Sequence, residues 1–400
     1  MVYISKRIRS LNSSPTIAMA ERARELRASG KDIIGLSSGE PDFDTPQHIR
    51  VAAAEAMERG ETRYTDVAGT PALRDAVIRK FSRENGLSFD RNQIIVGTGA
   101  KQLIFNALVA TLDEGDEVIV PAPYWVSYPD MVHLAGGVCV VADCTTREDL
   151  KLTADILRDV ITPRTRWLIL NSPNNPTGAV YSRDELADLA ALLLEHPAIN
   201  IMSDDIYEHI RFEDTPFATL AQVEPGLADR ILTINGVSKA YAMTGWRIGF
   251  AGGPADLVGA MVKIQSQTTS NATSIAQAAA VVALDGPQDC VEDGRRVFER
   301  RRDLVMNIFA GANRIKSCRP AGAFYMLVDC RDLIGGSAEG SGHFADDEML
   351  VRFFLENANV ALVAGSAFGI PGFFRMSCAA GDDVLREAAN RIVKASWLIS

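Results

Sequence analysis

A lysine and an arginine stand out in the segment NGVSKAYAMTGWRIGF, residues 235–250. Lys239 lies among small residues with no carboxylate near it in the sequence, and Arg247 opens the next apolar run. A lysine whose amine stays neutral can attack an aldehyde and form a carbon–nitrogen bond with it. A solvated surface lysine and arginine are the alternative, so the choice depends on what the rest of the chain places beside them.

Three other segments with reactive or polar residues also follow apolar runs. TGAKQ follows the run at 93–97, SPNNPTG follows the run at 166–171, and SDDIYE overlaps the end of the run at 199–204. Ligands of open parallel sheets bind beyond the carboxyl ends of the strands. We therefore expect these segments and the lysine segment to meet at one edge of one sheet.

Pyridoxal phosphate is an aldehyde that such a lysine can hold, and the other segments suit the rest of this cofactor. A buried carboxylate keeps its ring nitrogen protonated, and Asp204 would provide it. Tyr207 and Asn175 would donate hydrogen bonds to its phenolic oxygen. Because Tyr207 follows three residues after Asp204, we expect Asp204 to face the ring nitrogen and Asp205 to have a structural role.

The phosphate of the cofactor favours a helix N-terminus and a cation. The segment GAK at 99–101 would open a helix, and PYW at 123–125 would supply a flat face for the ring. The candidates for phosphate and ring are Gly99, Ala100, Lys101, Trp125 and Arg247. The segment NNPTG, taken alone, is also a good turn.

Arg375 lies in the segment FFRMSC between the apolar residues Phe374 and Met376. A guanidinium in such surroundings needs a partner. Arginine holds a carboxylate through two parallel hydrogen bonds, so we expect Arg375 to bind one.

These residues need a sheet with alternating strands and helices to position them. Short apolar runs lacking polar alternation predict buried strands at 93–97, 117–121, 138–142, 166–171, 199–204, 230–235 and 247–253. Helical patterns lie between them at 100–112, 124–135, 183–195 and 256–266. Ser182 and Glu185 form a capping box at the start of the third helix. The alternation predicts an α/β fold with a mostly parallel sheet.

A second domain is expected after a long charged helix at 290–311. The elements predicted there are a strand at 323–330, a helix near 346–358, strands at 360–365 and 373–378, and a closing helix near 382–399. The segment IGGSAEGSGHF at 334–344 predicts a flexible Gly/Ser-rich loop.

The composition excludes several classes of protein. A length of 400 residues suggests about two domains, and 47% hydrophobic with 23% charged residues is ordinary for a globular enzyme. A net charge of −10 counts against nucleic-acid and anionic-membrane partners. The start has no signal-peptide core, and no run reaches about 18 apolar residues. The cysteines and histidines show no metal-ligand spacing, which predicts reduced thiols, a cytoplasmic protein and no metal site.

The segment GVSKAYAMTGWRIG resembles the lysine signature of the fold-type I, class I aminotransferases. SGEPDFDTP, SPNNPTG, SDDIYE and FFRMSC follow the order expected for that family, and the resemblance runs from about residue 6 to the C-terminus. Together the motifs look most like the gamma subgroup, which contains aspartate, prephenate and aromatic aminotransferases. The resemblance implies a central sheet sandwiched by helices and a smaller α+β domain built from both ends of the chain. We expect an arm at 1–15, a large cofactor-binding domain at 48–289, and a small domain at 16–47 and 290–400.

The resemblance also implies roles for individual residues. Arg375 would hold the α-carboxylate of the substrate, and Gly39, Trp125 and Asn175 would also contact the substrate. Ser238 would bind the cofactor beside Lys239. Tyr64 would reach the phosphate of the neighbouring subunit's cofactor, in a homodimer with shared active sites. Such an enzyme moves an amino group between an L-amino acid and a 2-oxo acid by a ping-pong mechanism, with Lys239, Asp204 and Tyr207 as its catalytic residues.

The resemblance leaves the substrate side chain open. Gamma relatives that use prephenate carry a lysine near the N-terminus, and this chain has Asn12 there, which counts against prephenate. The segment at 265–274 lacks the arginine with which alpha-type enzymes bind a distal carboxylate, so Lys101 is the candidate. We expect aspartate and 2-oxoglutarate, with an aromatic or broad-specificity aminotransferase, prephenate included, as the alternative. A C–S lyase uses the same lysine, and a cofactor-sensing transcriptional regulator would carry a DNA-binding domain ahead of the fold.

Overall fold

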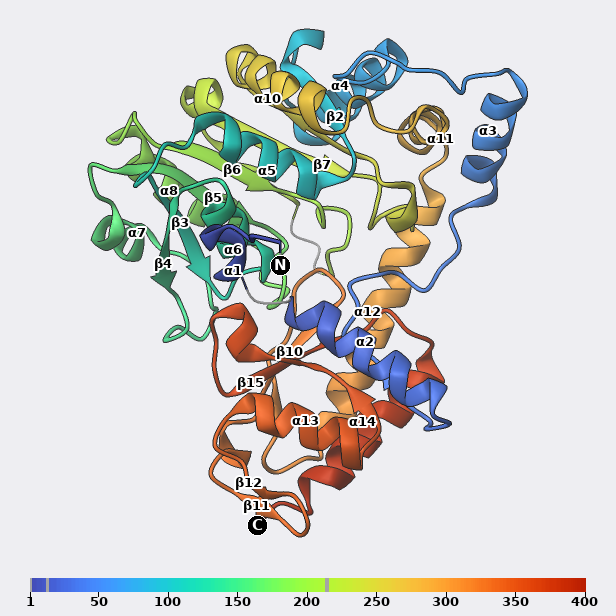
Figure 1. The fold of residues 1–400 in the computed structure, drawn as a ribbon, viewed down its shortest axis with the longest axis vertical. Coiled ribbons are helices and arrows are strands. Elements are labelled where there is room, and N and C mark those ends of the chain that lie inside the picture. The colour runs from blue at the N-terminus through green and yellow to red at the C-terminus, as the bar shows by residue number, and fades with distance from the viewer. Residues whose placement is uncertain (1, 12–13, 213–215) are drawn as a thin grey trace.

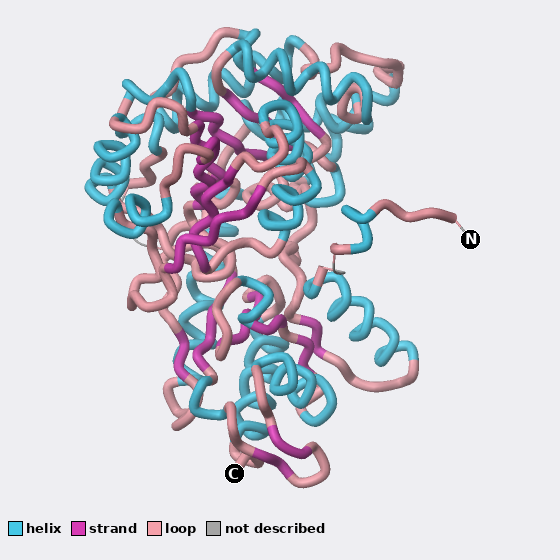
Figure 2. Tube along the Cα trace, turned by 60° about the vertical axis from the view of Figure 1, so that its left-hand side comes forward, coloured by secondary structure: helices cyan, strands magenta, loops and turns pink. Residues whose placement is uncertain are grey.

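The structure is a computed structural model that describes residues 2–11, 14–212 and 216–400. A large domain with a twisted sheet lies above a smaller α+β domain in Figure 1, and the long helix α12 runs down from one to the other. The tube in Figure 2 shows the strands of the large sheet as a column enclosed by helices. Among the described residues, no helix has the length and apolar character needed to cross a bilayer.

Seven strands form the large sheet in the order β2-β8-β7-β6-β5-β3-β4. Their bounds are β2 Ile94–Gly97, β3 Glu117–Ala122, β4 Val138–Asp143, β5 Thr165–Asn171, β6 Asn200–Asp204, β7 Ile231–Gly236 and β8 Gly249–Gly252. Only β8 runs antiparallel to its neighbours, β2 and β7. The carboxyl ends of β2, β5, β6 and β7 therefore share one edge, as the sequence predicts.

Helices cover both faces of this sheet, because side chains along each strand alternate between two cores. In β5, Leu168 and Leu170 belong to one apolar cluster while Trp167 and Ile169 belong to the other. One face carries α5 (Ala100–Thr111), α6 (Ser127–Leu134) and α10 (Ala255–Thr268). The other carries α4 (Pro71–Asn85), α7 (Ala154–Val160), α8 (Arg183–Leu194), the short α9 (Leu220–Val223) and α11 (Ser274–Asp285), against which α3 (Gln47–Glu58) packs. The capping box at Ser182 and Glu185 is confirmed.

The small domain combines a four-stranded antiparallel sheet, β14-β15-β10-β9, with helices from both ends of the chain. Its strands are β9 Lys316–Ser317, β10 Tyr325–Asp329, β14 Val363–Ala364 and β15 Phe373–Ser377. Its helices are α2 Pro15–Ala28, α12 Asp289–Phe309, α13 Asp347–Asn357 and α14 Asp382–Ser396. The N-terminal segment joins this domain where β1 (Ile34–Gly35) pairs with β13 (Val360–Ala361). The short helix α1 (Lys6–Arg9) lies instead against α6, through Arg7 and Ser10.

Three expected elements differ in the structure. The loop expected at 334–344 contains a small hairpin, β11 (Ser337–Ala338) with β12 (Gly342–His343), and ends in the buried Phe344. The strand expected at 360–365 is divided between two sheets, as β13 and β14. The strand expected from 247 begins only at Gly249, because Arg247 adopts a left-handed backbone conformation with φ of 58°. The domain boundaries expected from the sequence stay a prediction.

Candidate active site

A cavity of about 330 Å³ opens between the carboxyl edge of the large sheet and the small domain. Eleven of the thirteen residues expected at the site line it, and they are Gly39, Ala100, Lys101, Trp125, Asn175, Asp204, Tyr207, Ser238, Lys239, Arg247 and Arg375. Arg247 precedes β8, and since β8 is antiparallel its start lies at the same edge as the ends of the parallel strands. The topology thus explains how segments far apart in the sequence converge.

Lys239 follows β7 and directs its amine into the cavity. The Nζ atom donates a hydrogen bond of 2.6 Å to the backbone carbonyl of Gly39. Burial of the amine, with a smaller effect of the nearby Arg247, lowers the pKa of Lys239 to about 8. A much larger fraction of the amine is therefore neutral near neutral pH than for an ordinary lysine, as attack on an aldehyde requires.

Asp204 ends β6 and is buried at the floor of the cavity. Burial raises its pKa to about 6, while a hydrogen bond of 2.6 Å from the Tyr128 hydroxyl to Oδ2 acts in the opposite direction. Asp205 does not line the cavity, and its Oδ1 accepts a hydrogen bond of 2.8 Å from the Ser203 hydroxyl. The two neighbouring carboxylates therefore lie in different environments, and only Asp204 can meet a ligand in the cavity.

Arg375 lies on β15 and is only 2% exposed. Its guanidinium donates 2.9 Å and 2.6 Å hydrogen bonds to two neutral oxygens, Oδ1 of Asn175 and the carbonyl of Ser37. Its Nε has no hydrogen-bond partner among the described residues. A buried cation held only by neutral groups, with one donor unused, is suited to an incoming carboxylate.

The helix α5 begins at Ala100, directly after β2, and its N-terminus faces the cavity. Gly99 precedes it with φ of 83°, a conformation that glycine adopts readily. A Cβ at Gly99 would overlap the guanidinium of Arg247, so the absent side chain lets this cation lie against the helix start. Free backbone N–H groups beside a fixed cation form a phosphate-binding arrangement.

Lys101 and Trp125 lie together at the mouth of the cavity. The ammonium of Lys101 is 4.6 Å from the centre of a Trp125 ring and donates a 3.1 Å hydrogen bond to the Ser127 hydroxyl. Trp125 lies two residues before the start of α6 at Ser127, whereas the sequence predicted a helix already at 124.

Two expected residues lie outside the cavity lining, and several lining residues were not expected. Gly99 acts through Arg247, as described above, whereas the side chain of Tyr64 is 91% exposed. The unexpected lining residues are Ser14, Thr16, Ile17, Ile104, Val126, Ser127, Tyr128, Asn171, Ile206, Thr244 and Tyr325. Of these, Tyr325 stands out because its hydroxyl lies 2.8 Å from that of Tyr207 and its ring lies under Arg375. Asn12 lies outside the described residues.

The cavity lining as a whole suits pyridoxal phosphate and an amino acid. Its titratable side chains include four cations, Lys101, Lys239, Arg247 and Arg375, but a single carboxylate, Asp204. Such an excess of positive charge attracts phosphates and carboxylates. The unused Nε of Arg375 suits a carboxylate, and the helix start at Gly99 with the guanidinium of Arg247 against it suits a phosphate.

Comparisons with known proteins identify relatives of this chain. The family described as aminotransferase class I and II matches residues 31–392. The chain is 54% identical to the aspartate/prephenate aminotransferase of Cereibacter sphaeroides, over 98% of each protein. The crystal structure of the aspartate aminotransferase from Rhizobium meliloti superimposes with a TM-score of 0.96, 48% identity and full coverage of both chains. The solved structure of the Thermus thermophilus aspartate aminotransferase with maleate superimposes with a TM-score of 0.92 and 42% identity, covering 99% of this chain and 100% of that one. This chain therefore belongs to the class I and II aminotransferases, the fold-type I enzymes that use pyridoxal phosphate to move amino groups between amino acids and 2-oxo acids.

Proposed function

We propose that this aminotransferase uses aspartate as amino donor and 2-oxoglutarate as acceptor. The observation that carries the proposal is a second cation, Lys101, on the lining of a cavity that already holds Arg375. A dicarboxylate substrate needs one cation for each carboxylate. The names of the relatives from C. sphaeroides and R. meliloti, and the maleate bound to the T. thermophilus enzyme, support a dicarboxylate.

The positions of the side chains support the catalytic roles that we propose. When bound, pyridoxal phosphate supplies an aldehyde that takes up the amino group and a protonated ring that withdraws electrons from the substrate Cα. Arg247 and the N-terminus of α5 would hold the phosphate, and Asp204 would keep the ring nitrogen protonated. Tyr207 and Asn175 would donate to the phenolic oxygen, and Trp125 would cover the ring. Ser238, Lys101 and Gly99 would complete the cofactor site.

The substrate is oriented from the small domain. Arg375 binds the α-carboxylate, and Gly39 closes over it from the N-terminal segment. This would hold the Cα hydrogen near Lys239, whose free amine would accept that proton. Because Gly39 and Arg375 both belong to segments of the small domain, substrate binding draws that domain onto the large one and excludes water.

A panel of amino donors tested against 2-oxoglutarate examines the proposed specificity. We expect aspartate to give the highest kcat/KM, while phenylalanine or tyrosine as the preferred donor would contradict the proposal. The name of the C. sphaeroides relative favours prephenate as a further acceptor, against the expectation drawn from Asn12, so prephenate belongs in the acceptor panel. Release of pyruvate and a thiol from cystathionine would indicate the lyase alternative.

We also propose a homodimer with shared active sites and a cytoplasmic location. Tyr64 supports the first, because an aromatic ring that is 91% exposed suits a surface that a partner subunit covers. The described cysteines are all free, which supports the second.

A further inference from the structure

The turn that follows β6 presents two different faces. Tyr207 points into the cavity, while the next residue, Glu208, points away into a buried cluster beneath α4. Residues 206–209 form a turn and belong to no helix or strand. Few backbone hydrogen bonds fix its shape; among them are Glu208 N–H to the Asp205 carbonyl at 2.9 Å and Ile210 N–H to the Tyr207 carbonyl at 2.8 Å. The position of Tyr207 therefore depends on what holds the adjoining side chains.

Glu208 is held by two residues of α4. The carboxylate is 4% exposed, with Oε1 accepting from the ammonium of Lys80 and Oε2 accepting from Nδ2 of Asn85 at 2.7 Å. Lys80, which is fully buried, also donates to Oδ1 of Asn85 at 2.7 Å and lies 3.4 Å from Glu84. The three donors of the ammonium thus face three acceptors. Burial acts to raise the pKa of Glu208, but the Lys80 ammonium and His209 hold it below its usual range.

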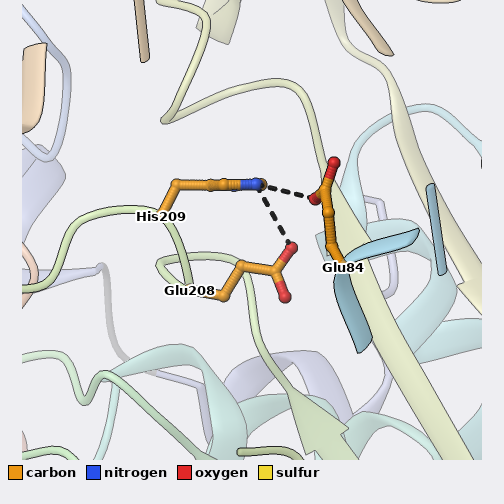
Figure 3. Close-up of side chains that lie close together, drawn as sticks. All are labelled: Glu84, Glu208 and His209. Carbon is orange, nitrogen blue, oxygen red and sulfur yellow. Dashed lines mark hydrogen bonds and ion pairs between the residues drawn. The ribbon is translucent and has the colours of Figure 1, made fainter. Parts of the chain in front are cut away.

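His209 and Glu84 complete the outer side of this cluster (Figure 3). The Nε2 atom of His209 lies 2.9 Å from Glu84 and 3.7 Å from Glu208. The ligand atoms of the three residues lie within 4.8 Å of one another, as in a metal site. The ammonium of Lys80, which contacts both carboxylates, already supplies the positive charge that a metal would bring. The cluster is therefore a structural ion-pair network.

A buried ion pair is weak evidence for stability, because desolvation offsets most of its attraction and apolar substitutes of similar volume are often neutral. What such a pair does provide is a defined position for the groups it joins. On the opposite side, the Tyr207 hydroxyl contacts Tyr325, and the Ile210 carbonyl accepts from Ala323 N–H, so the small domain also holds the turn. On the side of the large domain, the turn is held by α4, by the Ile206 side chain beside Gly236 of β7, and by the packing of the His209 ring on Tyr241.

We propose that Glu208, held by Lys80 and Asn85, is a positioning residue that fixes the Tyr207 hydroxyl at the phenolic oxygen of the cofactor. This inference rests on the role proposed above for Tyr207. Helix α4 does not line the cavity. In this inference it keeps the hydrogen bond between Tyr207 and the cofactor aligned while the small domain moves.

A thermodynamic cycle with Tyr207→Phe tests this inference in the holoenzyme. The double variant Lys80→Met/Glu208→Leu removes both charges and keeps an apolar fill. We expect it to fold, with a lower melting temperature because the buried Asn85 loses both of its partners, and to lose about 10- to 100-fold in kcat, since small misplacements cost that much. The pH midpoint of the visible absorbance of the bound cofactor should shift in the direction that Tyr207→Phe shifts it. Combined with Tyr207→Phe, the double variant should cause no further change in kcat or midpoint.

The control is Arg79→Met, which removes an ion pair from the same helix. Arg79 pairs with Asp285 at 2.6 Å and its side chain is 55% exposed, so kcat and the midpoint should stay unchanged. If the double variant lowers kcat by the same factor with and without Tyr207→Phe, the network does not act through Tyr207. The inference is then wrong, although the proposed role of Tyr207 stands. If Tyr207→Phe alone changes neither quantity, the proposed role of Tyr207 fails and the inference fails with it. Should the double variant not fold, Asn85→Ala removes one holder of Glu208 and enters the same cycle with the same criteria.

Discussion

The hydroxyl of Tyr128 donates a 2.6 Å hydrogen bond to the carboxylate of Asp204, and both side chains are buried. This bond stabilises the ionised form of a carboxylate whose pKa burial raises to about 6. In the proposed site, Tyr128 would therefore extend to lower pH the range over which Asp204 stays charged.

Tyr128→Phe should weaken cofactor binding on the acid side. The pKa of Asp204 then rises further above 6, so the charged carboxylate is lost at a higher pH as the pH falls. A hydrogen bond to a charged group contributes roughly 1.5–3 kcal/mol, which corresponds to about one to two pH units. Titrating the apoprotein with cofactor between pH 5 and 9, beside the parent enzyme, measures the shift. An acid limb at the same pH in both proteins would contradict the prediction.

Asp204→Asn should lower kcat far more than Asp205→Asn. Only Asp204 lines the cavity, and losing one preorganised electrostatic contact costs about 10²- to 10³-fold in other enzymes. The asparagine at 204 can still accept from Tyr128, so the comparison isolates the charge. Steady-state kinetics of both variants give the answer, and equal losses would show that the assignment of Asp204 to the ring nitrogen is wrong.

Cofactor attachment to the apoenzyme should accelerate as the pH rises and level off above about 8. Lys239 attacks as the neutral amine, and its pKa of about 8 means that the neutral form dominates above that pH. Stopped-flow absorbance across pH 6–10 measures the rate.

Lys239→Ala should abolish transamination but keep cofactor affinity through Arg247 and α5. Borohydride should fix the cofactor on Lys239 in the parent enzyme, and a reduced adduct on any other lysine would contradict the assignment.

Lys101→Ala should reduce kcat/KM for aspartate and 2-oxoglutarate more than for phenylalanine or alanine. Because the side chain is partly exposed at the cavity mouth, the loss should be near 1 kcal/mol, or about fivefold. If Lys101 serves only the phosphate, all donors weaken together and cofactor affinity falls. Measuring the donor panel with the cofactor affinity distinguishes the two roles.

Mixing two inactive proteins, Lys239→Ala and Tyr64→Ala, should restore part of the activity. In a dimer with shared sites, one of the two mixed sites has both an intact Lys239 and an intact Tyr64. Activity should reappear at the rate of subunit exchange. A fully active monomer in sedimentation experiments would exclude the shared site.

The strand ends could be predicted because each apolar run is closed by a recognisable motif. Asp204, Asn175 and Lys239 were located from those motifs, and parallel topology then brings them together. Tyr128 escaped detection since its partner Asp204 is 76 residues away and no local pattern links them. Tyr325 escaped for the same reason, because its contact with Tyr207 spans 118 residues.

Helices α3 and α11 were also missed, and the cause is their alanine content. The buried faces include Ala53 and Ala56 in α3 and Ala276, Ala279, Ala280 and Ala283 in α11. Such small side chains allow close packing of the two helices, but they contrast little with their neighbours on a hydropathy scale. The division of the strand expected at 360–365 has another cause. One continuous apolar run contributes β13 to one sheet and β14 to another, and the sequence does not mark the boundary.

The hydrogen bond between Arg375 and the Ser37 carbonyl joins residues that are 338 positions apart. During synthesis Ser37 is made early and Arg375 almost last, whereas every strand of the large sheet has been made once Gly252 is added. The residues proposed to hold the cofactor therefore all precede, by more than 100 positions, the arginine proposed to hold the substrate. A chain that is released before β15 would lack that arginine and could not turn over amino acids.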